Sequence, residues 1–339
     1  MLMADVFKAD AFSEVELVEA IEKMDFQPTL LGDMGLFEPQ PSRTTFIALE
    51  KKEGTNQLVP VSLRGAPLTE AERKRRDIRN VETHRIGKAS TVYATEVQNI
   101  RAFGSATELM QVQDLVAEGI MQTEGDLSLT EENMRLGAIQ GIVVDADGST
   151  VLNNWFTFWG ITPATPIAFN FAAATVAQVK ANVKKVQRHV VDNAKGLAIT
   201  EIMALTGDAF FDALIAHEAY TGNTQNPVEA QRLVDEYGVA YNKVSFGNIT
   251  WINYRGSQSE SAVAIPTNEV RFFPRARGLF KHGLGCAEFG PYINTPGRRR
   301  YAISIPDRDR EAWMSTELYS YPLFYCTRPE VLISGTRLA

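Results

Sequence analysis

The segment Asp145-Ala146-Asp147-Gly148 comes nearest to a metal site among the residues of this sequence. Closely spaced carboxylates near a glycine are typical of calcium loops, where glycine holds the sixth position and glutamate the twelfth. Counted from Asp145, glycine comes two positions early and Phe156 stands at the twelfth position. An Asp-Gly pair between apolar residues is also a strong signal for a β-hairpin turn, so we predict a hairpin over 142–151 without calcium.

Histidine and glycine patterns offer no catalytic or cofactor site. The sequence has four histidines: His84, His189, His217 and His282. His217-Glu218 begins like a zincin helix, but Thr221 stands where the second histidine is required. The glycine-rich stretch 278–290 lacks the dinucleotide and phosphate-loop patterns, and no G-x-S-x-G elbow is present. We therefore expect no catalytic residues, no metal and no cofactor.

Composition places the chain among folded, mildly acidic proteins. It has 339 residues, 45% hydrophobic and 22% charged, with a formal net charge of −7. These values are typical of a globular protein, and they argue against a nucleic-acid binder, which needs a basic surface. Basic and aromatic residues do alternate in 271–282 and 298–301, but the acidic total favours a subunit contact or ordinary surface there.

Targeting and cysteine patterns indicate a protein made in a cytoplasm. Acidic residues from Asp5 onward interrupt any signal-peptide pattern. The longest apolar stretch, 161–174, contains two prolines and is too short to span a bilayer, so we expect no membrane association. Cys286 and Cys326 are too few for a disulfide framework or a zinc site, and we expect buried free thiols.

The elements that must position these residues begin with an N-terminal arm over the first 40 residues. An amphipathic helix is predicted from Ser13 to Met24, followed by a segment in which glycines and prolines repeatedly break regular structure. Apolar residues lie inside that segment. Burial against a neighbouring chain and burial against the chain's own domain are equally compatible with this pattern.

The next part of the sequence is rich in β character. Strands are predicted at 44–49 and 58–63, joined by a turn at 53–56, and β character returns at 81–93. Between these strands, a charged excursion carries six basic residues: Arg64, Arg73, Lys74, Arg75, Arg76 and Arg79. A charged segment between paired strands should project from the body. The alternatives are a solvated loop or a short basic helix that starts at Thr69.

Two capping boxes predict two helices in the middle of the chain. Ser105–Glu108 and Ser128–Glu131 both show serine followed by glutamate three residues later. Apolar residues follow each box at helical spacing, and Gly125 and Gly141 are placed to end the helices. The clearest helix of the sequence is 175–194, in which valines recur every three or four residues.

The remaining segments mix strands with short helices, which predicts an α+β chain. The aromatic residues 155–159 read as a continuation of the β-hairpin. The other predicted helices are 210–220 and 228–237, and the other predicted strands are 198–205, 243–254, 262–265, 269–273, 301–305 and 318–325.

The end of the chain carries a resemblance to a known family. Residues 311–339 contain an aromatic run, then Tyr321-Pro322-Leu323, then Arg328-Pro329-Glu330 and a short β-rich tail. A charged arm at 64–85 and the pair Phe103-Gly104 precede two predicted helices. In this order the features resemble the major capsid proteins of tailed bacteriophages, specifically the lambda-like capsid protein E family.

The resemblance implies the tailed-phage major capsid fold, an α+β fold that is also seen in encapsulin shells and herpesvirus floors. In the family, an extension loop lies across an adjacent subunit. The implied divisions are an N-terminal arm (1–40), strands with the extension loop (41–95), a peripheral domain with spine helices and a β-hairpin (96–170), an axial domain (171–317) and a C-terminal strand that returns to the peripheral domain (318–339).

The resemblance also implies a mechanical function. Pentamers and hexamers of the chain would close into an icosahedral shell that encloses DNA without sequence-specific binding. Scaffolding and portal proteins are the implied partners, with decoration proteins as a further candidate. The implied location is the virion, after assembly in the host cytoplasm. The candidate contacts between subunits are Arg64, Arg73, Arg75, Arg76, Arg79, Arg298, Arg299 and Arg300.

Shells of this family expand when DNA enters, which requires a subunit with two arrangements. The helix pair 105–141 and the arm 64–85 are the candidates for the moving parts. An encapsulin-like cargo shell is the alternative function. A soluble enzyme of unknown class is the less favoured alternative, because the sequence lacks catalytic motifs.

Overall fold

The structure, a computed structural model, describes residues 30–53, 75–99, 108–221, 242–254, 264–310 and 312–338. Within these residues the helices are α3 (Leu30–Asp33), α4 (Ala94–Asn99), α5 (Glu108–Gln140), α6 (Trp155–Trp159), α7 (Val176–Ala194), α8 (Asp208–Ala216), α9 (Glu218–Thr221) and the 3-10 helices η2 (Gly290–Tyr292) and η3 (Pro329–Val331). The strands are β1 (Phe37–Pro41), β2 (Phe46–Glu53), β3 (Arg75–Glu82), β4 (Ile86–Tyr93), β5 (Ile142–Val144), β6 (Val151–Asn154), β7 (Ile167–Ala168), β8 (Ile199–Thr206), β9 (Lys243–Phe246), β10 (Ile249–Asn253), β11 (Glu269–Ala276), β12 (Phe280–Leu284), β13 (Tyr301–Pro306), β14 (Trp313–Ser320), β15 (Pro322–Cys326) and β16 (Ile333–Thr336). The predicted α+β class is confirmed.

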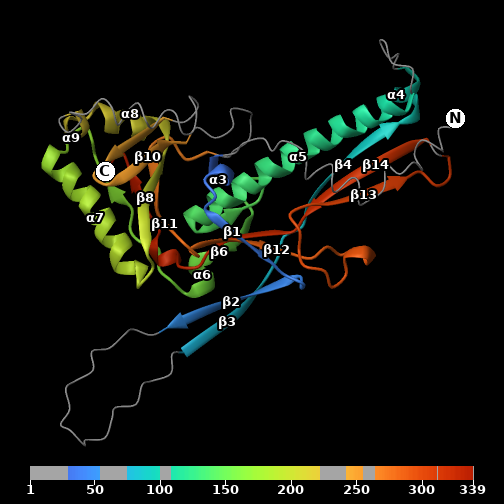
Figure 1. The fold of residues 1–339 in the computed structure, drawn as a ribbon. Helices are drawn as coiled ribbons and strands as arrows, with labels where there is room; N and C mark the ends of the chain where they lie inside the picture. Colours follow the sequence, from blue (N-terminus) through green and yellow to red (C-terminus); the bar gives the residue numbers. More distant parts are fainter. Residues whose placement is uncertain are drawn as a thin grey trace, which may run out of the picture.

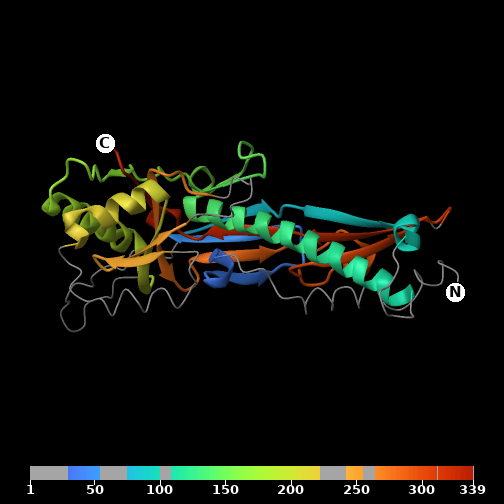
Figure 2. The ribbon, with the colours of Figure 1, turned by 90° about the horizontal axis from the view of Figure 1, so that it is seen from above.

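Helix α5 dominates one end of the elongated body (Figures 1 and 2). Its 33 residues extend for about 50 Å at the usual rise of 1.5 Å per residue. The helix lies along the three-stranded sheet β13-β14-β4, in which β14 pairs antiparallel with both neighbours. Several of its apolar residues are buried: Val116, Ile120, Met134, Ala138 and Ile139.

The two helices predicted from capping boxes form one continuous helix, so that prediction was wrong. Ser128 and Glu131 lie inside α5, and their side chains bond to groups other than the free N–H groups of a helix start. The Ser128 hydroxyl donates to the Glu124 carboxylate at 3.1 Å, and the Arg135 guanidinium donates to Glu131 at 3.0 Å. The first capping box begins outside the described residues.

A six-stranded sheet forms the other end of the body, in the order β7-β16-β11-β8-β10-β9. Successive residues of its central strand β8 point to opposite faces. Ile202 and Ala204 join the core that contains α7 and α8, whereas Met203 and Leu205 join the core that contains α3 and the end of α5. The sheet is therefore buried on both faces.

The strand predicted at 318–325 is divided into two strands at Tyr321. The first, β14, pairs with β13 and β4, whereas the second, β15, belongs to a different sheet in the order β1-β12-β15. Pro322 has no N–H to donate to a ladder. The Tyr321 carbonyl accepts a hydrogen bond from the Gly285 N–H at 2.8 Å, outside both ladders. One short segment therefore connects two sheets.

Several local predictions are confirmed. Helix α7 begins with a capping box between Thr175 and Gln178, and it ends at Lys195, whose φ of 44° is left-handed. The β5–β6 hairpin turns through Gly148, whose φ of 69° suits glycine. Further predicted strands are present with shifted ends at 198–205, 243–254, 269–273 and 301–305, the second as the hairpin β9–β10.

Other local predictions were wrong. The aromatic run 155–159 is the helix α6 and not a strand, because the Asn154 side chain caps it by accepting from the N–H groups of Phe156 and Thr157, each at 3.1 Å. The helix predicted at 210–220 is interrupted at His217. Residues 264 and 265 of the strand predicted at 262–265 lie outside any strand.

Part of the predicted charged excursion is a strand, and it pairs with the strand that was predicted to pair with 58–63. Strand β2 pairs antiparallel with β3 along eight residues, so Arg75, Arg76 and Arg79 lie in a strand and not in a loop or helix. Further predictions fall outside the described residues: the helix at 13–24, the strand at 58–63, the alternative helix at Thr69 and the helix at 228–237.

Candidate assembly site

Features of chemical sites are scarce in the part of the chain that the structure describes. No group of three or more His, Cys, Asp or Glu side chains is placed there to bind a metal ion, and no helix there is long and apolar enough to cross a membrane. The Asp147 carboxylate accepts hydrogen bonds from Ser149 and Thr150 within the hairpin turn. Cys326 is buried and Cys286 is half-buried, and both are free thiols.

The aromatic residues of the basic segment 271–282 face the interior. Phe272, Phe273 and Phe280 are all buried. Stacking on nucleic-acid bases requires exposed rings. These three rings therefore support the cores of the subunit, and the segment has no aromatic platform for a nucleic acid.

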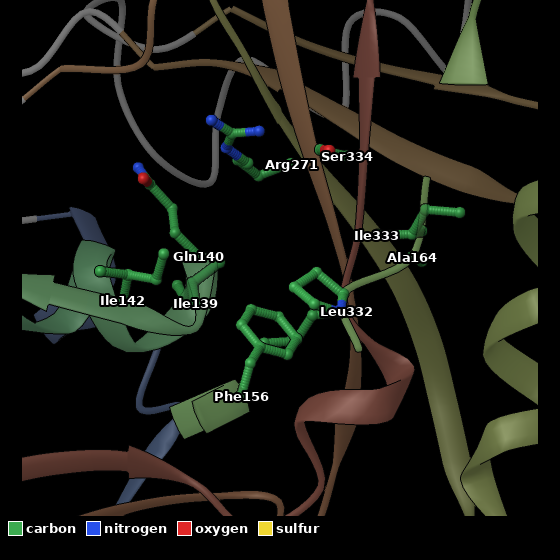
Figure 3. A pocket seen from close by; sticks show the side chains of 10 residues that line it. Ile139, Gln140, Ile142, Phe156, Ala164, Arg271, Leu332, Ile333 and Ser334 are labelled. Carbon is green, nitrogen blue, oxygen red and sulfur yellow. The ribbon is translucent and has the colours of Figure 1, made fainter. Parts of the chain in front are cut away.

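A cavity of about 200 Å³ lies between the end of α5, helix α6 and strands β11 and β16 (Figure 3). Ile139, Phe156 and Leu332 supply an apolar lining. Arg271 is the one charged residue of the lining, and it pairs with the carboxylate of Glu269 at 2.5 Å. The residues that line the cavity include no acid and base pair directed at a common point.

The antiparallel pair β2–β3, which we call the ribbon, extends away from the body (Figure 1). On one face, Ile47, Leu49 and Val81 are buried in a core with Trp155, Trp159 and Leu323. On the opposite face, Phe46 is 50% exposed and Ile78 is 61% exposed. The ribbon is therefore anchored at its base and presents large apolar side chains to the outside.

Arg79 reinforces the base of the ribbon. Its guanidinium lies 5.6 Å from the ring centroids of both Phe158 and Trp159, and it pairs with Asp77 at 2.9 Å. It also donates to the Phe158 carbonyl. Among the other arginines predicted to contact a neighbouring subunit, Arg75 and Arg76 lie in β3, while Arg64 and Arg73 fall outside the described residues.

The three consecutive arginines before β13 have different environments. Arg298 is exposed and lies 5.9 Å from the ring centroid of Tyr292. Arg299 is partly exposed, with an amino group 3.7 Å from the Glu131 carboxylate. Arg300 is buried. The structure thus places Arg298 and Arg299 at the surface and Arg300 in the interior of the subunit.

Arg300 reaches a buried polar stripe on α5. The stripe consists of residues spaced four, three and four apart, which share one helix face: Glu124, Ser128, Glu131 and Arg135. Arg300 Nε donates to Glu124 at 2.6 Å, and its amino groups contact Glu131 and Ser128. The Ser320 hydroxyl at the end of β14 donates to Glu131 at 3.2 Å. These bonds fix α5 against one end of the β13–β14 pair, where β13 begins and β14 ends.

The network keeps its charges despite its burial. Burial alone would raise the pKa of the Glu131 carboxyl, but attraction by Arg300 and then by Arg135 outweighs it and lowers the pKa to about 2. Nearby, burial lowers the pKa of His282 to about 3 against the attraction of Glu131. Near neutral pH, Glu131 is therefore ionised and the His282 ring is neutral.

Glu132, the residue beside Glu131, faces a different part of the subunit. Its carboxylate accepts from the backbone N–H of Leu31 in α3 at 2.8 Å and from the Tyr254 hydroxyl at 3.3 Å. Arg135 donates to it at 3.3 Å. Glu132 therefore connects the long helix with the N-terminal end of the described chain and with the end of β10.

This network of ion pairs was not predicted from the sequence. Ser128 and Glu131 fitted a capping box, which concealed their place in a polar stripe within a longer helix. One signal was available in the sequence. Polar residues recur at helical spacing from Glu124 to Arg135, and a triple arginine at 298–300 supplies partners for the carboxylates.

The long helix on a sheet, the projecting ribbon and the two-sided sheet together define the tailed-phage capsid fold. Solved capsid structures share it. The chain matches the putative capsid protein of a prophage of E. coli CFT073 with a TM-score of 0.62 and 10% identity, covering 97% of this chain and 100% of that one. It matches the capsid of Ralstonia phage GP4 with a TM-score of 0.53 and 8% identity, covering 90% and 87%.

Sequence relatives agree with this fold. The family model described as phage major capsid protein E matches residues 13–337. The major capsid protein of Salmonella phage Felix O1 is 24% identical, covering 89% of this chain and 90% of its own length. That of Pseudomonas phage KPP10 is 24% identical, covering 86% and 88%. The chain belongs to the phage major capsid protein E family, and it is a structural protein that forms the capsid shell.

Proposed function

We propose that copies of this chain join through their ribbons, each laid on the body of the next copy, to close an icosahedral shell around the phage genome. The observation that carries this proposal is the exposure of Phe46 and Ile78 on the outer face of a ribbon that leaves the body. An isolated two-stranded pair is marginally stable in water. A neighbouring subunit would bury these side chains and complete the environment of the ribbon.

Contact between different patches of identical subunits suits a shell. Such heterologous contacts produce closed assemblies when the rotation between copies closes. Each contact can be weak, because a subunit held by several neighbours leaves only when all of its contacts break together. Arg298 and Arg299 at the surface, together with the ribbon arginines, are proposed as further contacts.

The proposal extends to the assembly partners and to the enclosed DNA. Pentamers and hexamers assemble in the host cytoplasm with scaffolding and portal proteins, and decoration proteins are a further candidate partner. The chain acts without enzymatic activity, and it encloses DNA without reading its sequence. The divisions at residues 40, 95, 170 and 317, and an expansion that uses α5 and the ribbon, remain predictions. The net charge of −7 supports a lining that does not hold DNA tightly.

The test is assembly of the purified chain, alone and with a coexpressed scaffold, followed by light scattering and electron microscopy. Ile78→Ser should leave the free energy of unfolding within about 0.5 kcal/mol of wild type, because the side chain is exposed, yet reduce the yield of shells several-fold. Val191→Ser on α7, also at an exposed apolar residue, is the matched control. Shells formed equally by both variants would refute the role of the ribbon.

A further inference from the structure

Two adjacent carboxylates on α5 serve different parts of the subunit. Glu131 forms an ion pair with Arg300, the residue that precedes β13. Glu132 holds the Leu31 N–H of α3 at 2.8 Å. Both carboxylates are bound by one guanidinium, since Arg135 donates to Glu131 at 3.0 Å and to Glu132 at 3.3 Å. Arg135 is therefore the shared partner of two otherwise separate groups of contacts.

We propose that Arg300, Glu131, Arg135 and Glu132 form an ion-pair series that couples the surface at Arg298–Arg299 to the N-terminal segment at Leu31. The role of this coupling in assembly rests on the proposed function, because it needs a neighbouring subunit to touch the arginine surface. The coupling itself is a property of a single subunit and can be measured without a shell.

The geometry restricts how Arg135 can respond to a change at Arg300. Arg135 is buried, and its guanidinium carbon lies 5.0 Å from the ring centroid of Phe324, so the side chain has little room to leave. If Arg300 moves away, Glu131 keeps Arg135 as its remaining buried cation, with Arg299 at 3.7 Å on the exposed side. Arg135 then shifts toward Glu131, because an unpaired buried carboxylate is strongly unfavourable.

That shift weakens the hold on the N-terminal segment. Glu132 is also buried, and Arg135 is the cation bound to it. With the Arg135 guanidinium turned toward Glu131 within the same space, the Glu132 carboxylate is less stabilised, and its bond to the Leu31 N–H loosens. Other charged or titratable groups also face the series: Glu124, Arg299 and neutral His282, the Tyr254 hydroxyl that donates to Glu132, and Asp33 of α3, which Arg135 attracts.

Hydrogen bonds connect the exposed residue Arg298 with the backbone next to the buried Arg300. The Arg298 N–H donates to the Tyr301 hydroxyl at 2.9 Å, and that hydroxyl donates to the Gly285 carbonyl at 3.2 Å. The backbone on both sides of Arg300 is thereby held in one arrangement. A partner that binds Arg298 or Arg299 acts on residues next to Arg300, and it couples the two sites if it binds the two arrangements of Arg300 with different affinities.

Hydrogen exchange of α3 in unassembled subunits tests the coupling. Arg300→Met should speed the exchange of the Leu31 and Met34 amides about tenfold, by local opening. The control is Val186→Ala, which creates a cavity in the core on which α7 packs. Urea is used to make the free energy of unfolding of this control equal to that of Arg300→Met. Exchange in α3 that is no faster than in this control would overturn the proposal.

A gentler variant keeps the test decisive if Arg300→Met fails to fold. Ser320→Ala removes one hydroxyl that bonds both Arg300 and Glu131, and it should speed α3 exchange about threefold. In an Arg135→Met background, Ser320→Ala should have no further effect on α3, since the shared partner is gone. An undiminished effect in that background, or no effect of Ser320→Ala in the wild type, would refute the series.

The outcome is separate from that of the shell assay. Failure of the wild-type chain to form shells would count against the proposed function while leaving the exchange result unaffected. Wild-type shells together with unaltered α3 exchange in the variants would remove the coupling and leave the function standing.

Discussion

Arg300 and Glu131 are 169 residues apart in the sequence and form an ion pair in the interior of the subunit. The pair joins the C-terminal third of the long helix α5 to the residue that precedes β13. Hydrophobic contact along a helix tolerates small shifts in register, whereas a buried ion pair is satisfied at one register only. We therefore assign to this pair the positioning of α5 on its sheet.

Removing the charge of Glu131 should destabilise the subunit strongly. Glu131→Gln leaves Arg300 and Arg135 buried with one fewer carboxylate, and breaking such pairs costs about 3–5 kcal/mol. Urea unfolding measures the loss. The comparison variant is Lys88→Met, which removes an exposed ion pair between β4 and Asp126 of α5. This change should cost less than about 1 kcal/mol. Similar losses in the two variants would contradict the importance of the buried pair.

As the pH falls, His282 should lower the free energy of unfolding at a higher pH than the protonation of carboxylates does. Its pKa is about 3 in the folded subunit against an ordinary value of 6.5, so the unfolded state takes up the proton first as the pH falls. Stability is full above pH 6.5 and declines toward pH 3, with a loss of about 1.4 kcal/mol between pH 7.5 and 5.5. Urea unfolding at the two pH values should show no such loss in the free energy of unfolding of His282→Phe. If the variant keeps the loss, another group causes it.

Two glycines of α5 should respond differently to alanine. A Cβ on Gly137 would lie 2.7 Å from the backbone of Val143, so Gly137→Ala should lower stability by about 1–3 kcal/mol despite its better helix propensity. A Cβ on Gly119 would meet mainly the Ser90 hydroxyl. Thermal unfolding should show that Ser90→Ala rescues Gly119→Ala. The same substitution should give Gly137→Ala no benefit, and rescue of both would argue against the backbone clash.

Arg79→Lys should loosen the base of the ribbon without unfolding the subunit. Lysine keeps the charge but lacks the planar group that lies over Phe158 and Trp159. Because the site is partly exposed, the expected cost is about 1 kcal/mol. Hydrogen exchange of β2 and β3 should rise severalfold while that of α7 stays constant. Equal exchange in wild type and variant would show that the buried aliphatic residues alone hold the ribbon.

Local signals in the sequence predicted those elements whose determinants are local. The valine stripe of α7 lies within one segment, and so does the Asp-Gly turn of the β5–β6 hairpin. The family resemblance supplied the capsid fold, which the comparisons with known proteins confirmed, whereas the implied divisions of the chain remain predictions.

The sequence failed where distant residues decide the structure. Ser128 and Glu131 look like a helix start until Arg300 is placed beside them. Strand β2 could not be assigned to β3 by turn chemistry, because the two strands are separated by a long segment. The network at Glu132 depends on Leu31 and Tyr254, which are 101 and 122 residues away, and no spacing rule connects such positions.

The six-stranded sheet has a consequence for how the subunit comes apart. Alternate residues of β8 belong to different cores, so a melted β8 would expose both cores to water at once. Neither of these two cores can then lose its structure while the other remains intact. In calorimetry the six-stranded sheet and the helices on its two faces should therefore melt in a single cooperative transition, so that this part of a capsid subunit resists stress as one unit.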